Sequence, residues 1–219
     1  MSPYRIKYQT IEFNNHDIHI KTLRDRQQFS DPDGVAADLG ISSAQWSLFG
    51  VIWNASQVMA HLIDTKDTTG LRILEVGCGI GLTSLLLNAR NEDITAIDHH
   101  PEAGAFLLSN AALNQDEAIP FLRTGWDNEA TGLGLFDLII GSDLLYEIEH
   151  IQLLSQFIYQ HAKSNCEVII VDPGRGFHTK FSRVMTALGF SHTQTETADT
   201  SRLTEPFKGK VLYYLKKPR

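Results

Sequence analysis

The chain of 219 residues is 42% hydrophobic and 21% charged, ordinary proportions for a soluble globular protein. No stretch approaches the ~20 apolar residues of a membrane span, and residues 1–10 contain no apolar signal-peptide core. The net charge is −7, and it is unevenly distributed. Residues 1–30 carry five Lys/Arg and three Asp/Glu and residues 201–219 carry six and one, which leaves 8 basic and 22 acidic residues between them. This acidic centre serves solubility or a cationic ligand, and it argues against a surface that binds nucleic acid. Since the sequence also shows no membrane span and no signal-peptide core, we expect a cytoplasmic protein that does not bind a membrane.

The first 70 residues predict a cap rather than a second domain. Polar and apolar residues alternate over 4–13 and 16–23, which indicates a β-hairpin, and a helix is expected over 55–63. We therefore expect a single domain over residues 1–219, in which residues 1–70 extend a core formed by residues 71–219.

From residue 71, short apolar runs alternate with amphipathic stretches of helical length. The runs predict seven strands, over residues 71–76, 93–98, 118–123, 136–142, 167–172, 192–197 and 210–215. Helices are expected over 80–89, 101–114, 147–162 and 177–188. Near-continuous apolar strands indicate an α/β fold with helices on both faces of a mostly parallel sheet. The last two strands alternate polar and apolar residues, which predicts an antiparallel C-terminal hairpin.

The turn after the first of these strands is rich in glycine. Gly77, Gly79 and Gly81 form a G-x-G-x-G pattern, which falls short of the dinucleotide fingerprint G-x-G-x-x-G. Asp98 ends the next strand, where a carboxylate can accept hydrogen bonds from ribose hydroxyls. Together these features predict a nucleotide cofactor, either NAD or S-adenosylmethionine (SAM). A structural turn beside a solvated Asp98 is the plainer alternative.

Glu75 separates the two cofactors because it lies inside a predicted buried strand. A buried carboxylate is costly unless it is paired. SAM carries a cationic ammonium and a cationic sulfonium, whereas a pyrophosphate would be repelled by Glu75. The SAM carboxylate can instead meet the backbone amides of the glycine turn and the helix start.

These motifs resemble those of the seven-strand (class I) SAM-dependent methyltransferases. LEVGCGIG (74–81) resembles their first motif, AIDHHP (96–101) their acidic second-strand end, and FDLIIGSDLLYE (136–147) their fourth-strand segment. More specifically, the chain is similar to methyltransferase family 16, on the segments GVIWNA (50–55) and DLLY (143–146) and on Trp126. The resemblance implies a Rossmann-like fold and transfer of a methyl group to a protein lysine.

The resemblance also implies a set of cofactor-binding residues. These are Trp53, Glu75, Gly77, Cys78, Gly79, Gly81, Asp98, His99, Trp126, Asp127 and Ser142. Trp53 is expected to stack over the methionine or adenosyl part of SAM, although such a Trp is more often part of a core. His99 lies along the adenine edge or is a solvated turn residue. The family often places an acidic residue before the Trp that follows the third strand, whereas here Gly125 precedes Trp126 and Asp127 follows it.

Asp143 and Tyr146 are the expected catalytic residues. A lysine amine with a free pKa of ~10.4 costs about 4.6 kcal/mol to keep neutral at pH 7. Since a carboxylate stabilises the ammonium form, we assign Asp143 to gripping and aiming the lysine rather than to strong base catalysis. Tyr146 is expected on the same side of a helical turn, as a wall of the lysine channel. The structural alternatives are a helix N-cap for Asp143 and a core aromatic for Tyr146.

Further polar residues and the cysteines carry less information. Asp172 and Arg175 could touch the substrate, but a strand that ends at Pro-Gly is the commoner explanation. Cys78 and Cys166 indicate two buried thiols rather than a disulfide framework. No Cys/His cluster has the spacing of a zinc site, so we expect no metal.

Other functions compete with protein-lysine methylation. Tyr159 and Lys163 have the Tyr-x-x-x-Lys spacing of short-chain NAD(P)-dependent dehydrogenases, but the glycine turn of that family is missing upstream. A binding module without catalysis is disfavoured because Asp143 and Tyr146 are both present. Within the methyltransferases, a small-molecule amine or a protein histidine is the alternative acceptor. We expect a monomer whose partner is a protein substrate that bears the target lysine.

Overall fold

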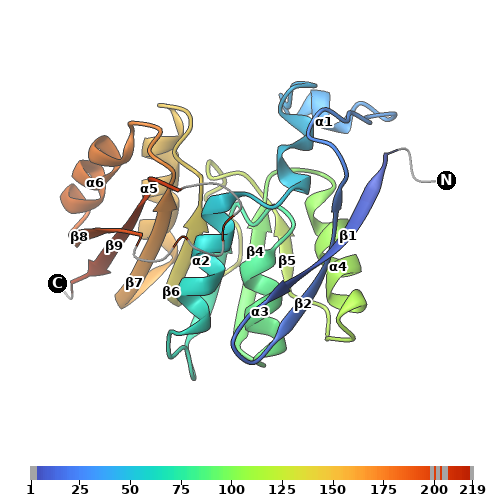
Figure 1. The fold of residues 1–219 in the computed structure, drawn as a ribbon. Coiled ribbons are helices and arrows are strands. Elements are labelled where there is room, and N and C mark those ends of the chain that lie inside the picture. Colours follow the sequence, from blue (N-terminus) through green and yellow to red (C-terminus); the bar gives the residue numbers. More distant parts are fainter. Residues whose placement is uncertain (1–3, 198–199, 201–202, 204–206, 218–219) are drawn as a thin grey trace.

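A seven-stranded sheet forms the centre of the computed structural model, which describes residues 4–197, 200, 203 and 207–217 (Figure 1). Its strands are β3 (Arg72–Val76), β4 (Asp93–Asp98), β5 (Phe121–Arg123), β6 (Phe136–Ser142), β7 (Ala162–Asp172), β8 (Phe190–Glu196) and β9 (Lys210–Lys216). Their order in the sheet is β5-β4-β3-β6-β7-β9-β8. Strands β3 to β7 pair in parallel, whereas β9 runs antiparallel to both β7 and β8. The predicted Rossmann-like fold with an antiparallel C-terminal hairpin is confirmed.

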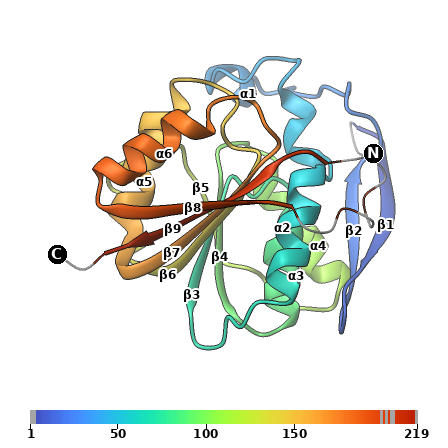
Figure 2. The same cartoon turned by 60° about the vertical axis from the view of Figure 1, so that its left-hand side comes forward.

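Helices cover both faces of the sheet (Figure 2). One face carries α2 (Asn54–Asp64), α3 (Leu82–Ala89) and α4 (Ala103–Leu113), and the other carries α5 (His150–His161) and α6 (His178–Ala187). Successive residues of a strand serve opposite faces, so Ile73 packs in one hydrophobic cluster and Leu74 in the other. This double burial explains why the strand sequences are apolar almost throughout.

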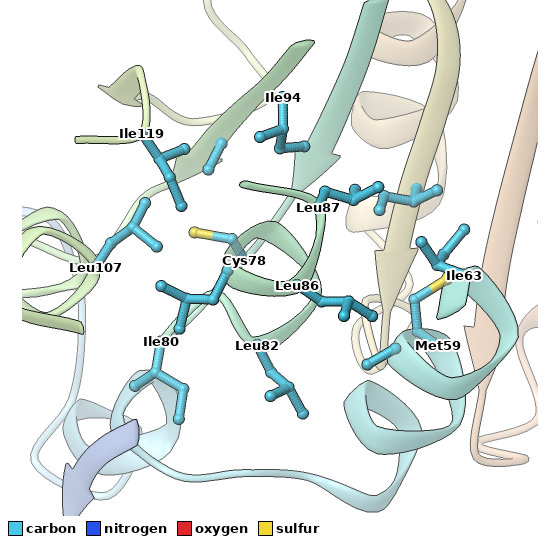
Figure 3. Packing of buried hydrophobic residues seen from close by; sticks show 14 of the residues in the cluster. Met59, Ile63, Cys78, Ile80, Leu82, Leu86, Leu87, Ile94, Leu107 and Ile119 are labelled. Carbon is cyan, nitrogen blue, oxygen red and sulfur yellow. The ribbon is translucent and has the colours of Figure 1, made fainter. Parts of the chain in front are cut away.

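The helices α2 and α3 illustrate the packing of the first face. Leu86 and Leu87 of α3 point toward Met59 and Ile63 of α2 (Figure 3). All four side chains are fully buried, so this contact fixes α3, whose first turn follows the glycine-rich segment.

The N-terminal hairpin consists of β1 (Ile6–Glu12) and β2 (Asp17–Leu23) and lies beside α3 and α4, outside the main sheet (Figure 1). Ile18 and Ile20 are buried in the same cluster as the helices of the first face. On α4, Asn110 Oδ1 accepts a hydrogen bond from the Lys21 N–H at 2.7 Å, and Asn114 Oδ1 accepts one from the His19 N–H at 2.8 Å. Asparagine side chains thus satisfy an open strand edge, which supports the proposal that residues 1–70 are a cap on one domain.

The helix α1 (Val35–Asp38) and the 3₁₀ segment η1 (Trp46–Gly50) complete the N-terminal part. Among the helices that the structure describes, none combines the length and the apolar character that crossing a membrane requires.

Three predicted elements begin three or more residues away from their expected start. The helix expected over 147–162 begins at His150, the strand expected over 118–123 begins at Phe121, and the strand expected over 167–172 begins at Ala162. The pairing of β6 with β7 shifts register between Phe136 and Leu138, and Asn165 has a φ of 68°. A bulge of this kind leaves residues unpaired, so polar side chains can occupy the first part of β7. Because residues 163–165 are polar, the sequence pattern did not predict a strand there.

We expect replacement of Ile20 by alanine to lower the free energy of unfolding by about 2–5 kcal/mol, because it leaves a cavity in the shared cluster. Chemical denaturation followed by circular dichroism measures this loss. The control is Tyr8→Ala on the exposed face of the same hairpin, which should change stability by less than about 0.5 kcal/mol. Equal small effects of both substitutions would show that the hairpin is not part of the cooperative core.

Candidate active site

The carboxyl ends of the parallel strands meet at one edge of the sheet. The strand order reverses between β3 and β6, since β4 follows β3 on one side and β6 lies on the other. Ligands of open α/β sheets bind at such a switch point. A ligand site is therefore expected in the segments that follow β3, β4 and β6, which contain most of the predicted site residues.

The glycine turn between β3 and α3 has a backbone that other residues rarely adopt. Gly77, Gly79 and Gly81 have φ angles of 61°, 57° and 75°. A Cβ on Gly79 would lie 2.9 Å from the carbonyl oxygen of Phe49, which belongs to η1. At Gly79 a side chain is therefore excluded both by the dihedral angle and by this neighbour.

Asp98, at the end of β4, ties the glycine turn to the neighbouring strand. Its Oδ2 accepts a hydrogen bond from the Gly79 N–H at 2.7 Å, and its Oδ1 accepts one from the His100 N–H at 2.8 Å. Burial nevertheless raises the pKa of the Asp98 carboxyl group. The structure thus brings Asp98 and Gly79 together, and ribose binding by Asp98 stays a prediction.

Cys78 contributes its backbone to this arrangement. Its N–H donates to the carbonyl oxygen of Ile97 at 3.0 Å. The thiol lies in the apolar cluster and points toward Leu107 and Ile119 (Figure 3). Burial raises the pKa of the Cys78 thiol, so its sulfur is a packing group. Both Cys78 and Cys166 are free and buried, in agreement with the sequence analysis.

Glu75, on β3, is buried and faces the first turn of α3. Its Oε2 accepts hydrogen bonds from the Ser84 N–H, at 3.0 Å, and from the Ser84 hydroxyl group. Burial raises the pKa of Glu75 to about 7 in spite of these bonds. The carboxyl group is therefore partly protonated at neutral pH, and a bound cation nearby would favour its ionised form. Its pairing with the positive charge of SAM stays a prediction.

The two predicted tryptophans contact different parts of the chain. The Nε1–H of Trp53 donates to the Leu48 carbonyl oxygen at 2.9 Å, and the guanidinium of Arg26 lies 4.8 Å from the centre of the Trp53 ring. Trp126 follows β5 and packs edge to face against His150 at 5.2 Å. A Cβ on Gly77 would lie 3.8 Å from the Trp126 ring, so Trp126 stands beside the glycine turn.

His99 and Asp127 lie on the exposed side of the same edge. A Cβ on Gly125 would be 2.6 Å from Asp127 Oδ1 and 3.7 Å from His99 Nδ1, so these two side chains are neighbours. His99 Nε2 is 3.2 Å from the carbonyl oxygen of Leu39. Ser142 is half-buried at the end of β6, where it pairs with Val171.

Asp143 directly follows β6 and has a φ of 56°. Its carboxylate forms a bidentate ion pair with Arg175: Nε lies 2.5 Å from Oδ1 and Nη2 lies 2.7 Å from Oδ2. The Asp143 side chain is 11% exposed. Because α5 begins only at His150, the expected helical turn through residues 143–146 is wrong, and Asp143 is not a helix N-cap.

Tyr146 is half-exposed, which excludes the alternative of a core aromatic. Its ring packs edge to face against His150 at 4.9 Å. Partial burial of the group and the nearby carboxylates of Glu147, Asp98 and Asp143 raise the pKa of Tyr146 to about 12. The phenol therefore keeps its proton at neutral pH, in the vicinity of both the Asp98 and the Asp143 carboxylates.

The sequence analysis missed the role of Arg175 and overlooked His100. The buried ring of His100 stacks on Phe49 with centres 3.9 Å apart, and burial lowers the pKa of His100 to about 3. A histidine two residues after Asp98 was visible in the sequence, but its burial depends on η1, about 50 residues upstream. Within the described ranges, no group of three or more His, Cys, Asp or Glu side chains could hold a metal ion.

The chain is similar in sequence to proteins of one known family. A family model described as lysine methyltransferase matches residues 38–186. The chain belongs to this family. It is 27% identical over 140 residues to the protein N-lysine methyltransferase METTL21A of Danio rerio, covering 59% of this chain and 63% of that protein. It is 29% identical over 170 residues to METTL21A of Mus musculus, covering 74% and 68%.

Among solved structures, the ribosomal protein L11 methylase of Lactobacillus delbrueckii subsp. bulgaricus matches with a TM-score of 0.63. The two chains are 18% identical, and the match covers 96% of this chain and all of the other, which shows the same fold.

Membership of the lysine methyltransferase family indicates SAM as the cofactor, since solved structures of this fold include methyltransferases with bound SAM. The residues present fit this cofactor, because the buried Glu75 and Asp98 carboxyl groups stand at the carboxyl ends of β3 and β4, where a cation and a ribose could meet them. The dehydrogenase alternative is wrong. Lys163 forms an ion pair with Asp137 at 2.7 Å near the start of β6, at the opposite end of that strand from Asp143.

The pKa of Glu75 makes a specific contribution to stability. Between the ordinary value of 4.5 and about 7, the folded chain holds a proton on Glu75 that the unfolded chain releases, so stability falls as the pH rises. Glu75→Gln keeps the acceptor for Ser84 but does not titrate. We expect the stability of this variant, relative to the native chain, to increase by up to ~3 kcal/mol between pH 4.5 and 7.5.

The measurement is a series of urea denaturations across that pH range. Taking the difference between the two proteins removes the opposite contribution of His100, whose lowered pKa makes stability rise with pH. A difference that is constant with pH would contradict a raised pKa at Glu75.

Proposed function

We propose that this protein transfers the methyl group of SAM to the side-chain amine of a lysine in a protein substrate. The observation that carries the proposal is the Asp143 carboxylate, which is mostly buried and holds a cationic side chain in a bidentate pair. It stands at the carboxyl end of β6, next to the glycine turn after β3. A group that binds a guanidinium there is suited to bind an ammonium.

The names of the relatives support the same acceptor. The METTL21A proteins of two vertebrates are described as protein N-lysine methyltransferases, although the matched region spans only about two thirds of their length. The acidic centre of the chain also suits a basic substrate segment. We further propose that the protein acts as a monomer in the cytoplasm and does not bind nucleic acid.

The proposed mechanism is mainly one of alignment. When bound, the cofactor supplies an electrophilic methyl group on a sulfonium. Asp143 binds the lysine as its ammonium and aims it along the edge of the sheet. The amine must then lose its proton to water, which costs about 4.6 kcal/mol at pH 7 for an unperturbed lysine. A nearby positive charge lowers this cost, whereas Asp143 raises it.

Tyr146 forms one wall of the proposed lysine channel. With a pKa of about 12 it is not a base at neutral pH, and its hydroxyl group is available as a hydrogen-bond donor or acceptor. Its half-exposed ring leaves an apolar surface beside Asp143, which suits the methylene stem of a lysine.

Replacement of Asp143 by asparagine should reduce methyl transfer by at least about 100-fold, because a neutral amide cannot hold the ammonium in position. The assay incubates the protein with isotope-labelled SAM and a lysate of its own host, and then quantifies the labelled band. SAM binding, measured by calorimetry, should survive. The matched control is Asp93→Asn at the start of β4, far from the carboxyl ends, which should leave transfer unchanged. Normal transfer by the Asp143 variant would place the acceptor elsewhere.

The pH dependence of transfer identifies the acceptor. Since a lysine amine must be neutral, the rate should rise by about tenfold per pH unit above pH 7 until the acceptor is deprotonated, provided that chemistry limits the rate. A histidine acceptor, with a pKa of ~6.5, would give a flat profile above pH 7. Hydrolysis of the labelled protein and amino-acid analysis distinguish methyllysine from methylhistidine directly.

A further inference from the structure

The guanidinium of Arg175 is bound to the Asp143 carboxylate, which is the group that we propose to bind the substrate lysine. Both guanidinium contacts, at 2.5 and 2.7 Å, go to the two oxygens of one carboxylate. The Asp143 side chain is 11% exposed, whereas that of Arg175 is 43% exposed. The carboxylate is thus fixed in the protein, while the cation that covers it reaches in from solvent.

Arg175 lies in a loop that is able to change its backbone. It is flanked by Gly174 and Gly176, which have φ angles of 96° and 92°. A Cβ on either glycine would have no neighbouring atom within 4 Å. With one unobstructed glycine on each side, the backbone at Arg175 can change its dihedral angles and redirect the Arg175 side chain at a small cost in free energy.

A second carboxylate, Asp172, lies three residues before Arg175 and is 1% exposed. Its Oδ2 accepts the Gly174 N–H at 3.1 Å, but no donor from the described residues reaches its Oδ1. His178 Nδ1 is 3.8 Å from Oδ2, too long for a hydrogen bond. Since a buried carboxylate oxygen without a donor is costly, Asp172 offers an unused position for a cation. The charge of Asp172 also acts on Arg175, whose pKa it helps to raise.

We propose that Arg175 is a specificity-determining residue, which holds Asp143 until a cationic side chain of the substrate displaces it and then turns to the free oxygen of Asp172. This proposal rests on the proposed function, because it takes Asp143 as the binding group of the acceptor. No covalent step is involved. The exchange replaces one ion pair by two, Asp143 with the substrate and Asp172 with Arg175.

The exchange explains selection of a cationic acceptor. A neutral group would leave the mostly buried Asp143 carboxylate without a cation, which is costly, whereas an ammonium replaces the guanidinium as its partner.

The first test uses Arg175→Gln, which frees Asp143, with Arg175→Lys as an intermediate variant. We expect Arg175→Gln to lower the half-saturating concentration of the labelled host protein by about two- to tenfold, with the maximal rate within about twofold. Arg183→Gln, an exposed arginine on α6, is the control of equal charge and should change neither value. A higher half-saturating concentration, or a loss of maximal rate with SAM binding intact, would overturn the proposal.

A second test examines the partner of the exchange with a double-mutant cycle. In the native background, Asp172→Asn should raise the half-saturating concentration of the host protein substrate. The reason is that Arg175, once displaced from Asp143, no longer finds a carboxylate at residue 172. In the Arg175→Gln background the same substitution should have no effect. Equal effects in both backgrounds would overturn the exchange. Calorimetry with SAM shows in each case that the variant is folded.

The third test does not require a known substrate or any activity. In protein labelled with ¹⁵N-arginine, the Nε–H signal of Arg175, assigned from its loss in Arg175→Lys, reports the bond to Asp143. Titration with n-butylamine hydrochloride should shift this signal, and n-butanol should not. An equal response to both probes, or to neither, would overturn the proposal. If the native protein labels no lysine although the signal responds to n-butylamine alone, the proposed function fails and the exchange stands.

Discussion

The hydrogen bond from the Gly79 N–H to the Asp98 carboxylate is the constraint on which the cofactor edge depends. It joins the turn after β3 to the end of β4, and Gly79 makes it with a positive φ of 57°. The carbonyl oxygen of Phe49 closes the remaining space beside Gly79. The position of α3 follows from this turn, and the packing of α3 against α2 keeps it there.

Electrostatics gives the same edge its chemical character. Burial raises the pKa of Glu75, Asp98 and Asp172, and each carboxyl group is met differently by the protein. Glu75 is held by a serine, Asp98 by two backbone amides and Asp172 by the backbone amide of Gly174, while a fourth carboxylate, Asp143, is held by Arg175. An edge with four carboxyl groups favours positively charged ligands. A sulfonium and an ammonium are the two cations that protein-lysine methylation brings together.

The sequence predicted the sheet and the position of the glycine turn well, because both depend on local patterns. Apolar runs located β4 and β6 to their last residues, Asp98 and Ser142, and the glycine spacing located the turn. Contacts between distant segments were beyond its reach. Asp143 and Arg175 are 32 residues apart in sequence, and no local sequence pattern predicts that they form an ion pair. The burial of His100 likewise depends on the packing of η1, which has no periodic pattern.

The close approach of Phe49 to the glycine turn has a practical consequence for anyone who wishes to shorten this protein. A fragment that begins at residue 71 would retain every strand of the main sheet. It would nevertheless remove Phe49 from beside the glycine turn, uncover the ring of His100, and leave the asparagines of α4 without their backbone partners. Trimming should therefore stop well upstream of the Rossmann-like core.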